Sequence, residues 1–404
     1  MGRRVLVGVV VLALAAFGCS QETTTTETEG GDGEVAVQLD GQTTQFNGAF
    51  PAFFPGKLSA HPGETIAFKL PHFSGEPHTV TLGTLVNAAA AKADSLGENA
   101  KFEQLARLDD GPEMLKLPDI FFHRPPPGPP SPNQSAAQPC VVQTGTPPLS
   151  LTGGAPACAQ KTLGDFKGTE AFYNSGLLME DGASFDLKLA DDIKPGTYRM
   201  MCMLHRAGMR GTITVVPKEQ SADSAADVRS RGRAELKKIV DALTEVQPQL
   251  AKATASNALS GIGTPDVPDA LIAEWGPKNL NVKKGETVSW KIFLFHNIAL
   301  NPPEGAVGAF TKGRDGKIEF NGPAAAAINS PQPPPVTAFF PPPADAKPLT
   351  VNGGPWDGKA FRNSSILGSV KPLEITYTTT FTTAGTYQLR CLLHPDMKGT
   401  VTVT

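Results

Sequence analysis

Two stretches of the sequence, GTYRMMCMLH (196–205) and GTYQLRCLLH (385–394), decide the fold because they are one motif written twice. Side chains alternate along a strand with a period of two, so the tyrosine and the cysteine of each motif share one face. A similar closing segment follows each motif, RGTITV (210–215) or KGTVTV (398–403). The sequence therefore predicts two copies of one β unit, each with an inward-pointing cysteine at the end of a core strand.

The match between the copies extends upstream. PGKLSAHPGETIAFKL (55–70) resembles PKNLNVKKGETVSWKI (277–292), and FYNSGLL (172–178) resembles FRNSSIL (361–367). In TIAFKL and TVSWKI, apolar and polar residues alternate after a Gly-Glu turn, which is typical of a half-buried strand. Many short strands separated by turns predict an all-β protein of two tandem sandwiches. The 41 Gly and 37 Pro residues among 404 fit this turn-rich architecture.

We expect domain 1 at 35–217, with an insert at about 84–170, and domain 2 at 277–404, with an insert at about 302–360. The region between them, 218–276, is predicted to be a helical linker that ends in a Gly- and Pro-punctuated connector over 254–276. Its apolar residues follow a helical stripe that must stop before Pro248. The stripe consists of Leu236, Ile239, Val240, Leu243 and Val246. A strut packed on one sandwich or between both is the predicted role of the helix, and partner binding is the alternative.

Both inserts contain an aromatic and proline-rich stretch, DIFFHRPPPGPPSP (119–132) and VTAFFPPP (336–343). Such runs favour stiff polyproline II structure, and we expect a belt over the sandwich. The alternative is a partner-docking face that uses Phe121–Phe122 and Phe339–Phe340. Residues 87–110 predict an additional helix in the first insert only.

The start of the chain predicts export. Residues 1–18 combine MGRR with the apolar run VLVGVVVLALAAFG, as in a signal peptide, and the run is too short for an ordinary membrane span. Residues 19–34 are polar and predict a flexible tether. The segment resembles a bacterial lipoprotein signal, which implies a lipidated Cys19 and membrane anchoring, and a plain secretory signal is the alternative. Both predict an extracytoplasmic location.

Each copy carries a cysteine, a histidine and a methionine on one short loop, and a second histidine far upstream at the end of an early strand. One thiolate, two imidazoles and a weak thioether form the ligand set of a blue-copper electron-transfer site. The sequence thus predicts two copper ions, one per domain. The predicted ligands are His78, Cys202, His205 and Met209 in the first copy, and His296, Cys391, His394 and Met397 in the second.

The whole pattern, G-T-Y-x-x-x-C-x-x-H-x(2,3)-M followed by G-T-[IV]-T-V, resembles the cupredoxins, specifically the plastocyanin-like and amicyanin-like blue copper proteins. The resemblance covers nearly all of both copies outside their inserts, and it implies two cupredoxin-type Greek-key sandwiches with one type 1 copper each. The first copy departs from the pattern, because one more residue precedes Met209 and Thr79 stands where the second copy has Asn297. Met201 and Met203 therefore remain alternative sulfur ligands. We expect different reduction potentials at the two sites.

The cysteine motif has two other interpretations. A copper-free core is one, but it does not explain why the same set recurs in both copies. Zinc is the other, and it has little use for a thioether. The remaining cysteines, Cys140 and Cys158, lie in the first insert, and outside the cytoplasm we expect a disulfide between them.

The predicted function is that of an electron carrier and not an enzyme. Multicopper oxidases and copper nitrite reductases need further histidines, and this chain has no His-x-His. Only His61, His72 and His123 are left, which are too few for a trinuclear cluster, although their number still allows a mononuclear catalytic site.

Copper delivery or sequestration is the alternative function, suggested by methionines near the first site (Met179, Met200, Met201 and Met203). The expected partners are redox proteins of a respiratory or other electron-transport chain. A net charge of −3 without basic runs argues against nucleic acid as a partner.

Overall fold

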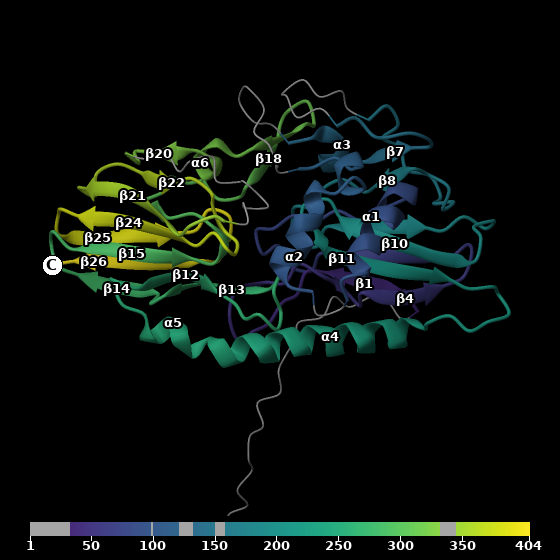
Figure 1. Cartoon of the computed structure of the whole chain (residues 1–404), viewed down its shortest axis with the longest axis horizontal. Coiled ribbons are helices and arrows are strands. Elements are labelled where there is room, and N and C mark those ends of the chain that lie inside the picture. Colours follow the sequence, from purple (N-terminus) through teal and green to yellow (C-terminus); the bar gives the residue numbers. More distant parts are fainter. Residues whose placement is uncertain (1–32, 98–99, 121–131, 150–157, 332–344) are drawn as a thin grey trace, which may run out of the picture.

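The computed structural model describes residues 33–97, 100–120, 132–149, 158–331 and 345–404 (Figure 1), and it is mostly β-sheet with few helices. The predicted signal peptide and Cys19 lie outside the described residues, as do His123 and the phenylalanine pairs of the proline-rich stretches. Among the residues that are described, no helix is long and apolar enough to cross a bilayer.

The first half of the chain builds two sheets around a shared apolar core. In the smaller sheet the order is β3 (Phe53–Phe54), β1 (Ala36–Leu39), β5 (Thr65–Lys69), β9 (Ser184–Lys188). In the larger sheet it is β4 (Lys57–Ala60), β11 (Arg206–Val215), β10 (Gly196–Cys202), β6 (Thr81–Leu82), β8 (Phe172–Asn174), β7 (Cys140–Val142). Ile66 and Phe68 of the smaller sheet share one buried cluster with Met200 and Ile213 of the larger one, because alternate side chains of both sheets point inward.

The second half repeats this arrangement with two six-stranded sheets. One has the order β2 (Gly48–Ala49), β13 (Leu271–Gly276), β12 (Ala258–Ile262), β15 (Thr287–Ile292), β24 (Ile375–Phe381), β21 (Leu349–Trp356). The other has the order β14 (Asn279–Val282), β26 (Lys398–Val403), β25 (Gly385–Arg390), β17 (Ala299–Leu300), β22 (Arg362–Ser364), β20 (Ala327–Ile328). Two short pairs are added, β16 (Leu294–His296) with β23 (Leu367–Ser369), and β18 (Phe310–Lys312) with β19 (Ile318–Phe320). Trp290, Tyr377 and Leu389 lie in its core.

The matched NS segments have the same buried role in both halves. The Asn174 side chain donates to the carbonyls of Ser135, Ala136 and Gln138 at 2.9–3.1 Å, and so fixes the short helix α3 (Gln134–Ala137). Asn363 does the same for α6 (Gly322–Ala325) with the carbonyls of Pro323, Ala324 and Ala326. The last carbonyl groups of a helix have no partner within the helix. Each side-chain amide donates to such carbonyls, which would otherwise be buried and unpaired. The duplication therefore reaches into the inserts.

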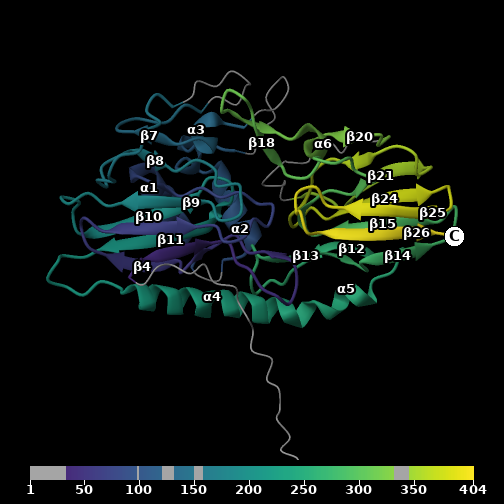
Figure 2. The same cartoon turned by 180° about the vertical axis from the view of Figure 1, so that it is seen from behind.

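Helix α4 (Ala225–Val246), continued by α5 (Pro248–Lys252), runs along one side of both halves (Figures 1 and 2). Ser224 caps it by accepting a hydrogen bond from the backbone N–H of Asp227, and the helix ends before Pro248. Leu236, Val240 and Leu243 of the predicted stripe are buried in one cluster with Ile272 of the second half. In the first insert, the segment predicted as one helix forms two, α1 (Thr84–Asp94) and α2 (Phe102–Ala106).

Residues 254–276 differ from the predicted connector, because they form β12 and β13, which join the sheet of the second half. The Gly- and Pro-rich stretch that suggested a connector is the loop between these two strands, and their apolar residues, such as Leu271 and Trp275, are buried. Strand β2 of the first half pairs with β13, so one sheet contains residues of both halves. The Gln134 side chain adds a second tie, with hydrogen bonds of 2.9 and 3.1 Å to the backbone of Ile318.

The predicted disulfide between Cys140 and Cys158 is present, with a Cα–Cα distance of 5.4 Å. It begins at strand β7 and closes the loop that follows this strand.

Candidate metal centres

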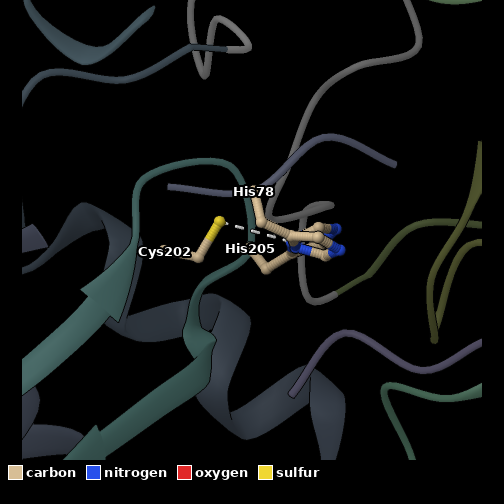
Figure 3. A group of neighbouring side chains, drawn as sticks. All are labelled: His78, Cys202 and His205. Atoms are coloured by element: carbon tan, nitrogen blue, oxygen red, sulfur yellow. Dashed lines mark hydrogen bonds between the residues drawn. The ribbon is translucent and has the colours of Figure 1, made fainter. Parts of the chain in front are cut away.

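Three of the four predicted ligands of the first copy, His78, Cys202 and His205, converge on one point, which we call centre 1 (Figure 3). The candidate ligating atoms of His78, Cys202 and His205 all lie within 4.8 Å of one another. Cys202 ends β10, and the tight turn before β11 brings His205 Nδ1 to 3.5 Å from Cys202 Sγ. His78 is held by backbone hydrogen bonds to Leu178, and its ring centroid is 4.9 Å from that of His205.

The second copy builds the same arrangement, centre 2. The candidate ligating atoms of His296, Cys391 and His394 lie within 4.8 Å of one another. Cys391 Sγ is 3.4 Å from His394 Nδ1, and the Nδ1 atoms of His394 and His296 are 3.1 Å apart. Cys391 follows the end of β25 and His296 ends β16, so strands distant in sequence place the ligands.

The methionines differ in how they relate to the thiols. Met397 is tied to its loop by backbone hydrogen bonds of 3.1 Å to Cys391 and His394. Met209 is fully buried and belongs to the same core cluster as Cys202. Met201 and Met203 are also buried, but they belong to the other large cluster. Met209 thus shares a core cluster with Cys202, whereas Met201 and Met203 do not.

Both thiols lie in surroundings that favour the thiolate. Burial alone would raise the pKa of Cys202, but the charge and hydrogen bonds of His205 and His78 hold this pKa well below its usual value. His394 and His296 have the same effect on the pKa of Cys391. Burial would lower the pKa of His205, but the thiolate raises this pKa to about 10. The thiolate is the form of cysteine that binds metals, so both centres are electrostatically prepared for a cation.

The two upstream histidines differ in what supports their outer edge. Asp40 Oδ2 lies 3.4 Å from His78 Nε2, and this buried carboxylate is itself fixed by Ser74 and by backbone N–H groups. In centre 2 the corresponding nitrogen, His296 Nε2, is buried without a hydrogen-bond partner and lies against Gly261. His78 Nδ1, on the opposite edge of its ring, is also buried without a partner. His78 Nδ1, a buried nitrogen beside a thiolate and a second imidazole, fits a metal ligand.

Thr79 and Asn297 occupy equivalent places in spite of the substitution. The Thr79 hydroxyl accepts a hydrogen bond of 2.8 Å from the backbone N–H of Met203, which follows the cysteine. Asn297 Oδ1 accepts one of 2.6 Å from Leu392 N–H, also directly after the cysteine. Both side chains thus tie the ligand loop to the segment that carries the upstream histidine.

Glu76, which the sequence patterns did not indicate, lies between the two centres. Its Oε2 is 3.3 Å from His205 Nε2, and its Oε1 is 3.4 Å from His394 Nε2. Burial alone would raise the pKa of Glu76, but the two imidazoles hold this pKa well below its usual value. No repeat pattern could have identified this residue, because the second copy has Leu294 at the corresponding position.

The remaining histidines within the described residues do not join either centre. His61 contacts Glu64 and the carbonyl of Gln220, and His72 lies near Asp181 and Asp396. Across the part of the chain that the structure describes, the two centres are the only groups of three or more such metal-binding side chains.

Asp269, which is not a predicted ligand, packs beside Gly208 of the centre 1 loop and offers a test of pH dependence. Its Oδ1 is enclosed without a hydrogen-bond partner, and desolvation raises the pKa of this carboxyl to about 6. Because the folded state raises the pKa of this carboxyl, folding favours its protonated form. The contribution of this group to the free energy of unfolding is therefore fully present below the unfolded pKa, near 3.8, and is lost as the pH rises through 6.

The effect of Asp269→Asn on the free energy of unfolding of the metal-free protein should therefore differ between the two pH values. It should be more stabilising at pH 8 than at pH 4, by up to about 3 kcal/mol. Urea unfolding of both proteins at the two pH values measures the difference. An equal effect of the substitution at pH 4 and pH 8 would contradict the burial of this charge.

No protein-family model matches this sequence, and no curated protein matches it. Among solved structures, the chain is similar to reduced auracyanin from Roseiflexus castenholzii, at 16% identity over 46% of this chain and 100% of that chain, with a TM-score of 0.22. It is also similar to a purple cupredoxin from Nitrosopumilus maritimus, at 20% identity over 37% of this chain and 99% of that one, with a TM-score of 0.18. A copper-containing nitrite reductase from Thermus scotoductus matches at 12% identity over 92% and 99%, with a TM-score of 0.22.

These neighbours include cupredoxins.

Proposed function

We propose that this protein is a blue copper protein of two tandem cupredoxin-type Greek-key sandwiches that serves as a one-electron carrier. The observation that carries the proposal is the convergence of one thiolate-forming cysteine and two histidines at each of two buried points. We infer that domain 1 spans 35–217 and domain 2 spans 277–404. Met209 and Met397 complete the two ligand sets, and export with a lipidated Cys19 holds the chain at a membrane.

A copper ion bound at each centre supplies one-electron chemistry, because soft sulfur suits Cu(I) and imidazole suits Cu(II). The chain's part is to hold the ligands nearly still. Buried strands fix each cysteine, and the hydrogen bonds of Thr79 and Asn297 fix each ligand loop. A frame that changes little between two oxidation states keeps the reorganisation that accompanies electron exchange small.

Two observations favour the carrier over the other functions. Copper delivery requires ready release of the ion, but Cys202 and Cys391 are fully buried. An oxidase or nitrite reductase requires a further metal site, and the sequence has no His-x-His pair and only three histidines besides the predicted ligands. The partners that fit a carrier are redox proteins of an electron-transport chain.

Redox titration of the copper-loaded protein tests the proposal. We expect reversible one-electron reduction of two coppers per chain, with the metal retained and an intense blue colour in the oxidised form. Loss of Cu(I) to an added acceptor on reduction would instead identify a delivery protein. Turnover of oxygen or nitrite by the loaded protein would identify an enzyme.

Centre 1 should have the lower reduction potential of the two. The Asp40 carboxylate makes His78 a stronger donor and so favours Cu(II), whereas His296 lacks such a partner. The Thr79 N–H, 3.4 Å from Cys202 Sγ, acts in the opposite direction, but a buried carboxylate outweighs one neutral donor. Outer partners change metal affinity by about 10–100-fold, and tenfold corresponds to about 59 mV for a one-electron couple.

This order of potentials can be measured on single-centre variants. Titration of Cys391→Ser reports centre 1 alone, and titration of Cys202→Ser reports centre 2 alone. A higher potential for centre 1 would show that Asp40 does not set the difference.

A further inference from the structure

We propose that Glu76 joins the two centres into one electron-transfer unit, in which electrons reach centre 2 through His205, Glu76 and His394. This inference rests on the proposed function, because it requires a copper ion at each centre. It concerns a residue outside both predicted ligand sets.

The path consists of bonded atoms, one hydrogen bond (His394 to Glu76) and one ion-pair contact (His205 to Glu76). In each proximal histidine, Nδ1 faces the cysteine sulfur, at 3.5 Å for His205 and 3.4 Å for His394. On the opposite edge of each ring, Nε2 faces Glu76, at 3.3 Å and 3.4 Å. Each ring can therefore be a ligand at Nδ1 while its Nε2 faces the carboxylate, which is hydrogen-bonded to His394 and within ion-pair distance of His205. No gap in the path exceeds a long hydrogen bond.

The two centres differ in how far they are exposed. Every candidate ligand of centre 2 is closed to solvent, with His394 at 1% and Cys391 and His296 at 0% exposure. In centre 1, the His205 side chain is 17% exposed, and the Glu76 side chain is 16% exposed. A cavity of about 180 Å³ is lined by His205 and Glu76. An external partner can thus approach the His205 edge, whereas the smaller cavity beside centre 2, of about 100 Å³, meets a His394 that is only 1% exposed.

Two contacts between the halves hold Glu76 in this position. Gly75, with φ 105°, packs so closely on the Leu393 carbonyl that a Cβ at this position would overlap it. Leu393 precedes the ligand His394, so the segment that carries Glu76 is seated directly on the ligand loop of centre 2. The pairing of β2 with β13 fixes the two halves against each other. The contact between the centres is therefore built into the fold.

A shared carboxylate also predicts a shared electronic effect. A hydrogen bond from the outer nitrogen to an anion makes a metal-bound imidazole a stronger donor. Because the Glu76 carboxylate lies within 3.4 Å of the outer nitrogen of both rings, one substitution should change both centres together.

The test follows the reduction of the blue absorbance by excess hexacyanoferrate(II) in a stopped-flow instrument. In the wild type we expect both centres to be reduced rapidly. In Glu76→Gln, whose amide can accept from only one ring, half of the absorbance should be reduced at least an order of magnitude more slowly. Cys391→Ser, with centre 1 alone, should react rapidly, and Cys202→Ser, with centre 2 alone, should react slowly.

Glu64→Gln is the matched control. It removes the charge from another glutamate of the first half that is hydrogen-bonded to a histidine, His61, and its kinetics should equal those of the wild type. Potentials give a second readout, because Glu76→Gln should raise both by about 59 mV for each tenfold loss of preference for Cu(II).

A third readout needs no variant. In the Cu(I)-loaded wild type, NMR should show two slowly exchanging Nε2–H protons, from His205 and His394.

The outcomes separate this inference from the proposed function. A chain that does not take up two coppers contradicts the proposed function. Two coppers with identical kinetics and potentials in Glu76→Gln and the wild type, or equally rapid reduction of both single-centre variants, overturn the role of Glu76 alone. If Glu76→Gln does not fold, rapidly exchanging Nε2–H protons in the wild type still overturn it.

Discussion

Cys391→Ser should remove the copper of centre 2 and leave that of centre 1, so that copper content falls from two ions per chain to one. The reason is that the pKa of this thiol lies well below its usual value, which supplies the thiolate ligand, whereas a serine hydroxyl stays protonated and is a hard donor. Cys202→Ser should do the same to centre 1. Metal analysis and the blue absorbance of each variant measure the effect.

The double variant, with Cys202→Ser and Cys391→Ser, should have no blue copper site. Its far-ultraviolet circular dichroism spectrum should equal that of the wild type. That second measurement shows whether the loss comes from the ligand or from unfolding. Retention of both coppers and of the full colour in either single variant would contradict the assignment of its centre.

Gly75→Ala should be among the most destabilising single substitutions at the contact between the two halves. Its φ of 105° is unfavourable for any residue with a Cβ, which costs about 1–3 kcal/mol. The new methyl group would also overlap the backbone oxygen of Leu393 and the ring of Pro395, and such overpacking costs about 1–3 kcal/mol more. Urea unfolding of the metal-free protein measures the sum.

Gly285→Ala is the matched control, because Gly285 has φ 87° and nothing within 4 Å of an added Cβ. This variant should lose the unfolding free energy that comes from placing a Cβ at a positive φ, but none from overlap with neighbouring atoms. If both variants lose the same unfolding free energy, Gly75 does not hold the halves in close contact.

The sequence was enough to predict those features that depend on local pattern. The repeated GTY-to-methionine motif indicated the paired sheets, and its cysteine and histidine lie together in both halves, with the upstream histidine beside them. The cysteine and the histidine of each motif are close in sequence, and the strand periodicity of two fixes which way the cysteine points. The turns after β10 and after β25 must therefore bring the two side chains together.

Features that depend on how the halves are placed could not be predicted in this way. Glu76 acts on a histidine 318 positions away, and Asp40 lies 38 positions from His78. Neither residue is repeated in the other copy, so the duplication gave no indication of them. The strands β12 and β13 were missed for a related reason, because the glycines and prolines of the loop between them dominate that stretch.

X-ray absorption spectroscopy at the copper edge of the loaded protein, together with a metal count, tests the two centres most directly. We expect two coppers per chain, each with one short bond to a thiolate sulfur and two bonds to imidazole nitrogens. Copper bound only to oxygen and nitrogen, with no sulfur neighbour, would show that Cys202 and Cys391 are core residues and not ligands.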